Sequence, residues 1–252
     1  MFVRRALIAA LAPVIFVSAC TSSSESQAQT TLKVYAASSL ANPFVDAGLA
    51  FEKDHPGVKV QFNLGSSSDL ARFVQEGAPA DVFASADVAN MDKVESGGLL
   101  DSPSVIFATN YLEIIVEKGN PLNITSLEDL SHPDLIFVTT NPDVPIGKYT
   151  AEVLNKAGVS ITPNSFESNV KGIMLKVASG EADAGIVYHS EVIAADGQVE
   201  GIKIPAEFNI VAKYPVGVIN SSARQSQAQE FVDFLSSSKG LAILTQHGFK
   251  TP

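Results

Sequence analysis

Short apolar segments with two different periods alternate along most of this chain. Residues 58–64 (Val-Lys-Val-Gln-Phe-Asn-Leu) alternate apolar and polar side chains, a period of two that is typical of a β-strand. Residues 169–179 instead carry apolar side chains at i, i+3, i+4 and i+7 from Val170, which predicts an amphipathic helix. Ser168 is the expected N-cap of this helix, and Gly180 is expected to end it.

The same two patterns predict strands and helices in alternation along the chain. The strands are expected at residues 31–37, 58–64, 81–84, 111–116, 135–139, 184–188 and 214–219. The helices are expected at about residues 40–51, 70–76, 88–95, 126–130, 147–156, 169–179, 227–235 and 241–246. The start of the first helix stays open. Either Ser39 caps it directly, or Asn42 is the cap and Pro43 takes the first helical position, where proline is favoured.

Strands that alternate with helices are typical of the α/β class, here with mixed, mostly parallel sheets covered by helices. Two such units of similar size follow each other, and the final helices have no partner in the second unit. Because chain termini usually lie close together, the C-terminal segment is expected to return to the first unit, with crossings near residues 110 and 213. The predicted lobe 1 therefore comprises residues 31–110 and 214–252, and the predicted lobe 2 comprises residues 111–213.

The first 30 residues are predicted to be an export signal followed by a tether. Arg4 and Arg5 precede an apolar run that is too short for a bilayer helix, which takes about 20 residues. The run ends in Val-Ser-Ala-Cys20, which resembles the lipobox of bacterial lipoproteins. Residues 1–19 are therefore predicted to be a lipoprotein signal peptide and Cys20 a lipidation site, although ordinary cleavage with an incidental Cys20 stays open. The Ser/Gln/Thr-rich residues 20–30 are predicted to be a flexible tether.

The charge balance limits the partners that this chain can have. It contains 17 Lys and Arg against 27 Asp and Glu. Residues 1–19 hold two arginines and no acidic residue, so without them 15 basic side chains face 27 acidic ones and the net charge is −12. This balance disfavours nucleic acid as a partner, and it disfavours electrostatic steering of anions. If the chain binds an anion, uncharged local donors must hold it.

Serines gather where two of the predicted strands end. Ser38 and Ser39 follow the first strand, and Gly65-Ser66-Ser67-Ser68 follows the second. In open α/β sheets, ligands bind at the carboxyl ends of strands. The free N–H groups and the dipole at a helix N-terminus favour an anion, and serine hydroxyls add further donors. One such cluster is most simply a helix cap, but two in equivalent positions predict an anion site.

Five segments, in order along the chain, together resemble the periplasmic molybdate-binding proteins of ABC importers. They are Ala36–Leu40, Gly65–Ser68, Gly77–Asp87, Val144–Gly147 and Gly185–Tyr188. The resemblance implies a two-lobed type II periplasmic-binding-protein fold, with a ligand cleft between the lobes that closes on molybdate or tungstate. It also implies an ABC transporter permease and its ATPase as partners, no cofactor, and an extracytoplasmic, lipid-anchored monomer.

The resemblance also implies which groups hold the oxyanion. They are the hydroxyl and backbone N–H groups of Ser39 and Ser67, the backbone N–H groups of Ile146 and Val170, and the hydroxyl of Tyr188. None of these side chains is charged, and none is expected to ligate a metal cation directly. Ile146 departs from the family, which more often has a small residue such as alanine at this position. Since the backbone is the donor there, binding is expected to survive with an altered pocket volume.

Other functions stay open on the sequence alone. A receptor for sulfate or another tetrahedral oxyanion would use the same donors, and size alone would distinguish sulfate from molybdate. A ferric-ion receptor would need a cluster of tyrosines, which is not expected here. A sensor of the same fold would lack a transporter partner.

An enzyme with Ser39 or Ser67 as its nucleophile would need a base at a comparable strand end, and none is found. No enzymatic activity is therefore expected. The histidines are scattered without metal-ligand spacing, at His55, His132, His189 and His247. His189 directly follows Tyr188, so it is the histidine that could influence access of the ligand.

Overall fold

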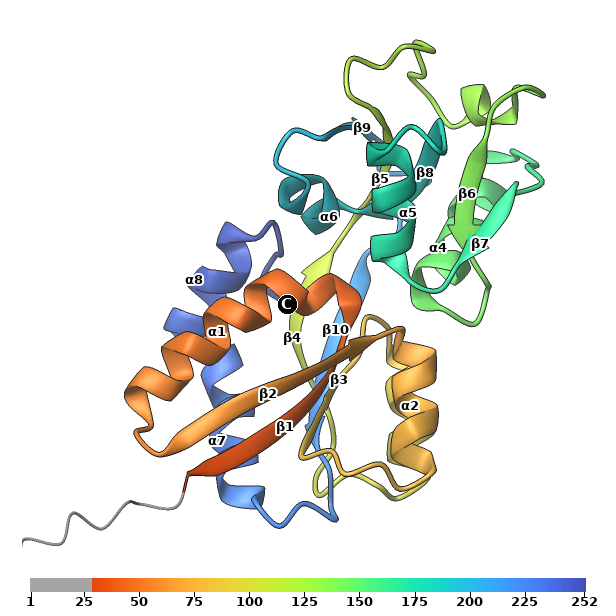
Figure 1. The fold of residues 1–252 in the computed structure, drawn as a ribbon. Coiled ribbons are helices and arrows are strands. Elements are labelled where there is room, and N and C mark those ends of the chain that lie inside the picture. Colours follow the sequence, from red (N-terminus) through yellow and green to blue (C-terminus); the bar gives the residue numbers. More distant parts are fainter. Residues whose placement is uncertain (1–28) are drawn as a thin grey trace, which may run out of the picture.

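Figure 1 shows the chain arranged in two lobes, each built on its own β-sheet, in the computed structural model. The structure describes residues 29–252. The predicted signal peptide, the predicted lipidation site Cys20 and the predicted tether up to residue 28 lie outside the described residues. Thr30, the last residue of the predicted tether, is already the first residue of strand β1 (Thr30–Ala37).

The sheet of the first lobe combines parallel and antiparallel strands. In spatial order its strands are β2 (Val58–Gly65), β1, β3 (Val82–Ala84), β10 (Ala212–Val218) and β4 (Val105–Asn110). Strand β1 is parallel to both β2 and β3, whereas β10 is antiparallel to β3 and β4. Because β10 comes from the last fifth of the chain, the chain returns to the first sheet after building the second.

The sheet of the second lobe repeats this arrangement. In spatial order its strands are β7 (Ser165–Glu167), β6 (Phe137–Thr140), β8 (Ala184–Tyr188), β5 (Leu112–Glu117) and β9 (Val199–Lys203). Strand β6 is parallel to β7 and β8, and β5 is antiparallel to β8 and β9. The mixed α/β architecture is as predicted, but antiparallel pairings are as frequent as parallel ones. They all involve β5 and β10, the strands that directly follow the crossings between the lobes.

Helices flank both sheets (Figure 1). In the first lobe they are the 3-10 helix η1 (Ser38–Leu40), α1 (Ala41–Asp54), α2 (Ser67–Gln75), α3 (Val88–Ser96), α7 (Gln225–Ser236) and α8 (Ser238–Gln246). In the second lobe they are the 3-10 helix η2 (Glu128–Ser131), α4 (Pro145–Ala157), α5 (Val170–Ala178) and α6 (His189–Ala194). No helix within residues 29–252 is long and apolar enough to cross a membrane.

Two segments connect the lobes, one at Tyr111 between β4 and β5, the other at residues 204–211 between β9 and β10. The side chain of Asn209 joins the two. Its Oδ1 accepts a hydrogen bond from the backbone N–H of Leu112 at 3.0 Å, and its Nδ2 donates to the Leu112 carbonyl at 2.9 Å. A pair of connections of this kind is the geometry of a hinge, about which two lobes open and close.

Aromatic packing holds the C-terminal helices on the first lobe. The ring of Phe231 in α7 meets Phe44 and Phe51 of α1 edge-on, with centroid distances of 6.1 and 5.3 Å. All three side chains are completely buried. Burying a phenylalanine stabilises a fold by roughly 1.5–3 kcal/mol, so this contact is a substantial part of what binds α7 to the first lobe.

Two predicted helix starts are wrong. Helix α1 is capped by neither Ser39 nor Asn42, because it continues directly from η1 and has no side-chain cap. Helix α5 is capped by Asn169 and not by Ser168. Strands β4, β7 and β9 and helix α6 are not among the predicted elements. Strands β7 and β9 lie at the edges of their sheet, and only one of their eight residues, Val199, is buried, so they lack a clear apolar period. Helix α6 has only six residues.

Candidate functional site

A small cavity between the lobes brings the predicted site residues together. Its lining residues are Ala37, Ser38, Ser39, Gly65, Ser66, Ser67, Ala86, Val144, Pro145, Ile146, Asn169, Val170 and Tyr188. All five predicted site residues are among them, and no lining side chain is charged. The first lobe lines the cavity with the ends of β1 and β2, and the second with the first turns of α4 and α5 and the end of β8.

The hydroxyl of Ser67, at the first position of α2, accepts a hydrogen bond from the backbone of the first lobe. Ser67 is 1% exposed, and its Oγ accepts a hydrogen bond from the backbone N–H of Ala86 at 2.9 Å. A serine hydroxyl has one hydrogen and two lone pairs. Since Ala86 can only donate, the hydrogen of Ser67 is left to donate elsewhere, and the cavity is adjacent. The backbone N–H of Ser67 has no protein acceptor among the described residues, as expected at the start of a helix.

Ser39 faces the cavity from η1, at the end of β1. It is 3% exposed, and its Oγ lies 3.2 Å from the phenol oxygen of Tyr214 on β10. This contact replaces the helix-capping role that was one alternative for Ser39. The two serines therefore reach the cavity from neighbouring parallel strands, because β1 and β2 pair in register up to Ala37 and Gly65.

Ile146 contributes its backbone to the cavity while its side chain packs into the protein, where it is 1% exposed. Pro145 takes the first position of α4 and Val144 the N-cap, and neither side chain can accept a hydrogen bond from the helix. The N–H of Ile146 has no acceptor among the described residues, so it is available to a ligand. Gly147 allows this approach, because a Cβ there would collide with the carbonyl oxygens of Thr140 and Asn141.

Val170 is placed in the same way at the start of α5. Its side chain is 3% exposed. The Asn169 side chain caps this helix, accepting from the N–H groups of Lys171 at 3.0 Å and Gly172 at 3.4 Å. Asn169 does not accept from the N–H of Val170, and no other acceptor for this group is found within residues 29–252. Helices α4 and α5 therefore each direct one free N–H and the positive end of a helix dipole at the cavity.

Tyr188 ends β8 and closes the cavity from the second lobe. Its side chain is 1% exposed, and its hydroxyl has no hydrogen-bond partner in the described part of the chain. Burial raises the pKa of this phenol well above its ordinary value, so the hydroxyl keeps its proton. A buried hydroxyl without a partner costs roughly 1–3 kcal/mol. A ligand in the cavity that accepts this hydrogen would remove that cost.

Three tyrosines pack together beside the cavity, so the expectation that the chain lacks a tyrosine cluster is wrong. The ring of Tyr188 meets those of Tyr149 and Tyr214 edge-on, at centroid distances of 6.4 and 5.7 Å. Only Tyr188 lines the cavity. Burial raises the pKa of all three phenols. Without a bound cation they are therefore neutral hydrogen-bond donors.

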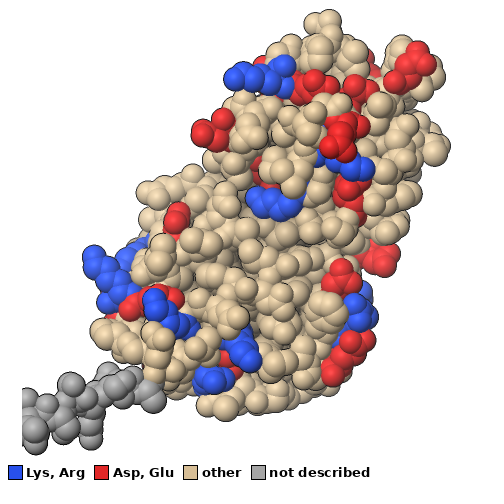
Figure 2. All heavy atoms as spheres, in the orientation of Figure 1, with Lys and Arg blue, Asp and Glu red and all other residues tan. Residues whose placement is uncertain are grey.

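None of the residues that line the cavity is charged. The ion pair of Lys171 and Glu191, with Nζ and Oε2 2.9 Å apart, joins α5 to α6, and neither residue lines the cavity. On the face shown in Figure 2, basic and acidic side chains form small separate groups with no continuous basic surface. The attraction for an anion must therefore come from hydroxyls, backbone N–H groups and helix dipoles, in agreement with the charge argument from the sequence.

His189 lies behind the cavity and is not part of its lining. Its Nδ1 is 3.1 Å from Glu113 Oε1, and its ring stacks on that of Tyr111 at 4.6 Å. Tyr111 belongs to the first connection between the lobes, so His189 contacts the hinge. Its influence on ligand access stays a prediction.

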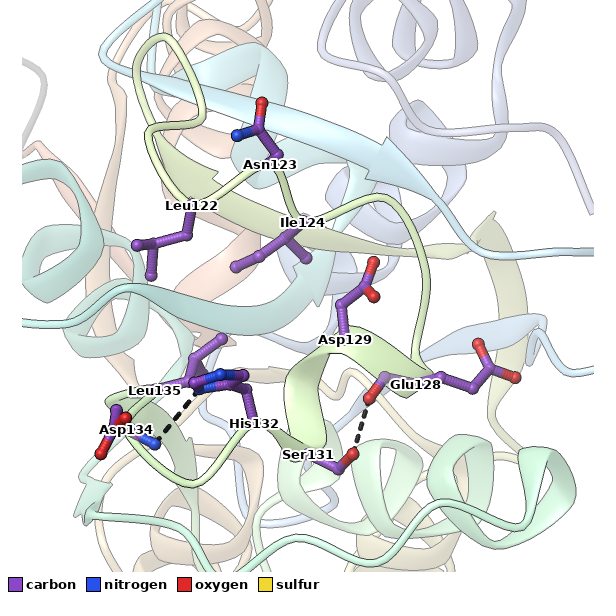
Figure 3. A pocket seen from close by; sticks show the side chains of 9 residues that line it. All are labelled: Leu122, Asn123, Ile124, Glu128, Asp129, Ser131, His132, Asp134 and Leu135. Atoms are coloured by element: carbon purple, nitrogen blue, oxygen red, sulfur yellow. Dashed lines mark hydrogen bonds between the residues drawn. The ribbon is translucent and has the colours of Figure 1, made fainter.

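A larger hollow lies elsewhere in the second lobe, around η2. Figure 3 shows its lining residues, with the carboxylate of Glu128 pointing away from the apolar side chains Leu122 and Ile124. The carboxylate of Asp129 is used locally, where it accepts from the N–H groups of Thr125 and Ser126 at 2.8 and 3.0 Å. No group of three or more His, Cys, Asp or Glu side chains suited to a metal ion occurs in the described residues.

Comparison with known proteins identifies the family of this chain. The family model for bacterial extracellular solute-binding proteins matches residues 32–250. The molybdate-binding protein ModA of Mycobacterium tuberculosis is 38% identical over 226 residues, which cover 90% of this chain and 87% of that protein. A putative ABC transporter substrate-binding lipoprotein of Bacillus subtilis, YvgL, is 29% identical over 251 residues, 96% of each chain.

Solved structures show the same fold. The periplasmic molybdate-binding protein of Azotobacter vinelandii superposes with a TM-score of 0.77 at 24% identity, covering 88% of this chain and 99% of that one. The sulfate-binding protein SubI of M. tuberculosis superposes with a TM-score of 0.80 at 20% identity, covering 88% and 87%. The chain therefore belongs to the bacterial extracellular solute-binding proteins, in the family that includes the molybdate-binding proteins.

Proposed function

We propose that this protein captures molybdate or tungstate in the cavity between its lobes and delivers it to an ABC transporter. The main support for the proposal is that uncharged hydrogen-bond donors line the cavity. Two serine hydroxyls, one phenol and the first N–H groups of three helices converge on a cavity that no charged side chain lines. A shell made of donors alone suits a small oxyanion that carries no proton.

The strength of such a shell is sufficient for a receptor. Hydrogen bonds to a charged group contribute roughly 1.5–3 kcal/mol each, so the six donors together contribute on the order of 10–20 kcal/mol. The cost of association is at least about 4 kcal/mol. Micromolar binding requires only about −8 kcal/mol, so neutral donors suffice without a bound cation or a charged side chain. The large Ile146 side chain belongs to the hydrophobic core, and its backbone N–H can serve as the donor at the cavity.

In the proposed cycle, the anion first meets the serines of one lobe, and rotation about the two connections adds the donors of the other lobe. The closed protein then docks on the permease, whose ATPase drives release. The protein acts outside the cytoplasm as a monomer, without a cofactor and without catalysing a reaction. Attachment to the membrane through a lipid on Cys20 is part of the proposal, and the likeness to a putative substrate-binding lipoprotein supports it.

Thermal unfolding of the chain without its first 19 residues tests the proposed ligand. Anything that binds only the folded state raises the unfolding temperature by mass action. Molybdate and tungstate are expected to raise it strongly, sulfate weakly and phosphate least of all. An equal shift with sulfate would identify the protein as a sulfate receptor, the alternative that uses the same donors. No shift with any oxyanion would contradict the proposal.

A further inference from the structure

Tyr214 does not line the cavity, but it contacts two residues that do. It lies on β10 of the first lobe, is completely buried, and places its phenol oxygen 3.2 Å from Ser39 Oγ. Its ring also packs edge-on against that of Tyr188 from the other lobe, at 5.7 Å. The Tyr214 side chain therefore contacts two of the residues proposed to hold the anion, and touches the cavity itself nowhere.

The direction of the Ser39–Tyr214 hydrogen bond decides what Ser39 can offer a ligand. Burial raises the pKa of Tyr214 well above its ordinary value, so the phenol keeps its hydrogen. If Tyr214 donates to Ser39, the single hydrogen of Ser39 is free to point into the cavity. If Ser39 donates to Tyr214, that hydrogen is used, and Ser39 presents only lone pairs to the cavity. A fully deprotonated oxyanion has only acceptors, so it requires the first arrangement.

Ser67 shows the same arrangement with a different partner. Its Oγ accepts from the backbone N–H of Ala86 at 2.9 Å, and a backbone N–H can never accept in return. Ala86 thus never competes for the hydrogen of Ser67, which is free to point into the cavity. Tyr214 takes the place of Ala86 for Ser39, but a phenol can both donate and accept. Ser39 is thus the hydroxyl in the shell whose role depends on a second side chain.

We propose that Tyr214 is a positioning residue that makes Ser39 a hydrogen-bond donor and thereby restricts the site to fully deprotonated oxyanions. This inference rests on the proposed function. Hydrogen phosphate keeps a proton at neutral pH and needs one acceptor in the shell, whereas molybdate and sulfate need none. Without the phenol, the Ser39 oxygen has lost its donor, and a protonated anion is the ligand that can replace it.

The test is Tyr214→Phe, with binding of molybdate, sulfate and inorganic phosphate measured by calorimetry near neutral pH. Molybdate and sulfate affinities are expected to fall about tenfold, and phosphate affinity to be unchanged or higher. The matched control is Tyr35→Phe, which removes a buried phenol from the same lobe but from the separate apolar cluster around Leu70 and Phe83. It should leave the ratio of molybdate to phosphate affinity unchanged.

Two further measurements separate positioning from packing. In a Ser39→Ala background, Tyr214→Phe should cost little, because the hydroxyl that it orients is gone. Should Tyr214→Phe not fold, Ser39→Ala is expected to lower the molybdate-to-phosphate ratio and Ser39→Thr, which keeps the hydroxyl, to preserve it. Equal loss for all three anions, or ratios that no variant moves, would overturn the proposal. A wild-type protein that binds no oxyanion would instead overturn the proposed function.

Discussion

Ser66 and Ser67 are neighbours at the start of α2, yet their hydroxyls have opposite surroundings. Ser66 Oγ accepts from the backbone N–H of Asp69 at 3.1 Å and donates to the Asp69 carboxylate at 2.7 Å. Ser67 Oγ accepts from the N–H of Ala86 and keeps its hydrogen for the cavity. Both residues line the cavity, but only Ser67 has a hydrogen to give. One serine therefore stabilises the helix, and the other is available to a ligand.

Ser67→Ala is expected to weaken molybdate binding by roughly 10- to 150-fold, since a hydrogen bond to a charged group contributes about 1.5–3 kcal/mol. The matched control is Ser66→Ala, which removes a helix cap and should lower the free energy of unfolding by about 0.5–2 kcal/mol. Calorimetric titration and urea unfolding of both variants measure the two effects. A larger loss of affinity in Ser66→Ala than in Ser67→Ala would contradict this division of roles.

Tyr188→Phe is expected to have opposite effects on stability and on binding. The hydroxyl is buried without a partner in the described residues, so its removal should leave the ligand-free protein equally stable or more stable. The same change removes one proposed donor, so molybdate affinity should fall by tenfold or more. Thermal unfolding with and without molybdate gives both quantities. A clearly destabilised ligand-free variant would show that the hydroxyl already has a partner, and the argument for a free donor would fail.

Much of the site could be predicted because it depends on local chemistry. The strand at residues 184–188 ends at Tyr188 in the structure as it does in the prediction, and serine clusters after strands mark the cavity. What local patterns could not supply were the partners of these groups. Ser39 and Tyr214 lie 175 positions apart in the sequence. The apolar pattern cannot show that these two side chains meet. It also cannot show that Ser39 lies within η1 and does not cap helix α1.

The strand pairings of the two sheets could also be predicted only in part from the sequence. Parallel pairings such as that of β1 and β2 follow from the alternation of strand and helix, which the apolar pattern displays. The antiparallel pairings of β5 and β10 depend on where the chain crosses between the lobes. That information lies in contacts distant in sequence, such as the two hydrogen bonds between Asn209 and Leu112.

Gly147→Ala is expected to damage binding through the backbone. A Cβ at this position would collide with the carbonyl oxygens of Thr140 and Asn141, so the first turn of α4 must move outward. Since the donor at this turn is the N–H of Ile146, molybdate affinity should fall by tenfold or more although no ligand-contacting side chain changes. Ala151→Gly, further along the exposed side of α4, is a control for altered helix propensity and should cost about 1 kcal/mol of stability with little loss of affinity. Unchanged affinity in Gly147→Ala would mean that α4 does not supply a donor.

Glu191 is expected to make the stability of the protein depend on pH. It is 1% exposed, and burial raises the pKa of its carboxyl in spite of the ion pair with Lys171. The folded state therefore binds this proton more tightly than the unfolded state does. Above the ordinary pKa of a glutamate, the unfolded chain releases the proton first, so the free energy of unfolding falls as the pH rises toward the folded-state pKa.

Glu191→Gln removes this titration. Urea unfolding of both proteins, at about pH 5 and about pH 8, isolates the contribution of Glu191 as the difference between them. The wild type should lose more stability than the variant over this interval, because the variant has no proton to release at this position. Glu181→Gln, an exposed change on the same lobe, should show the wild-type dependence. A variant whose stability changes with pH as steeply as that of the wild type would show that the Lys171 ion pair compensates the burial of Glu191 in full.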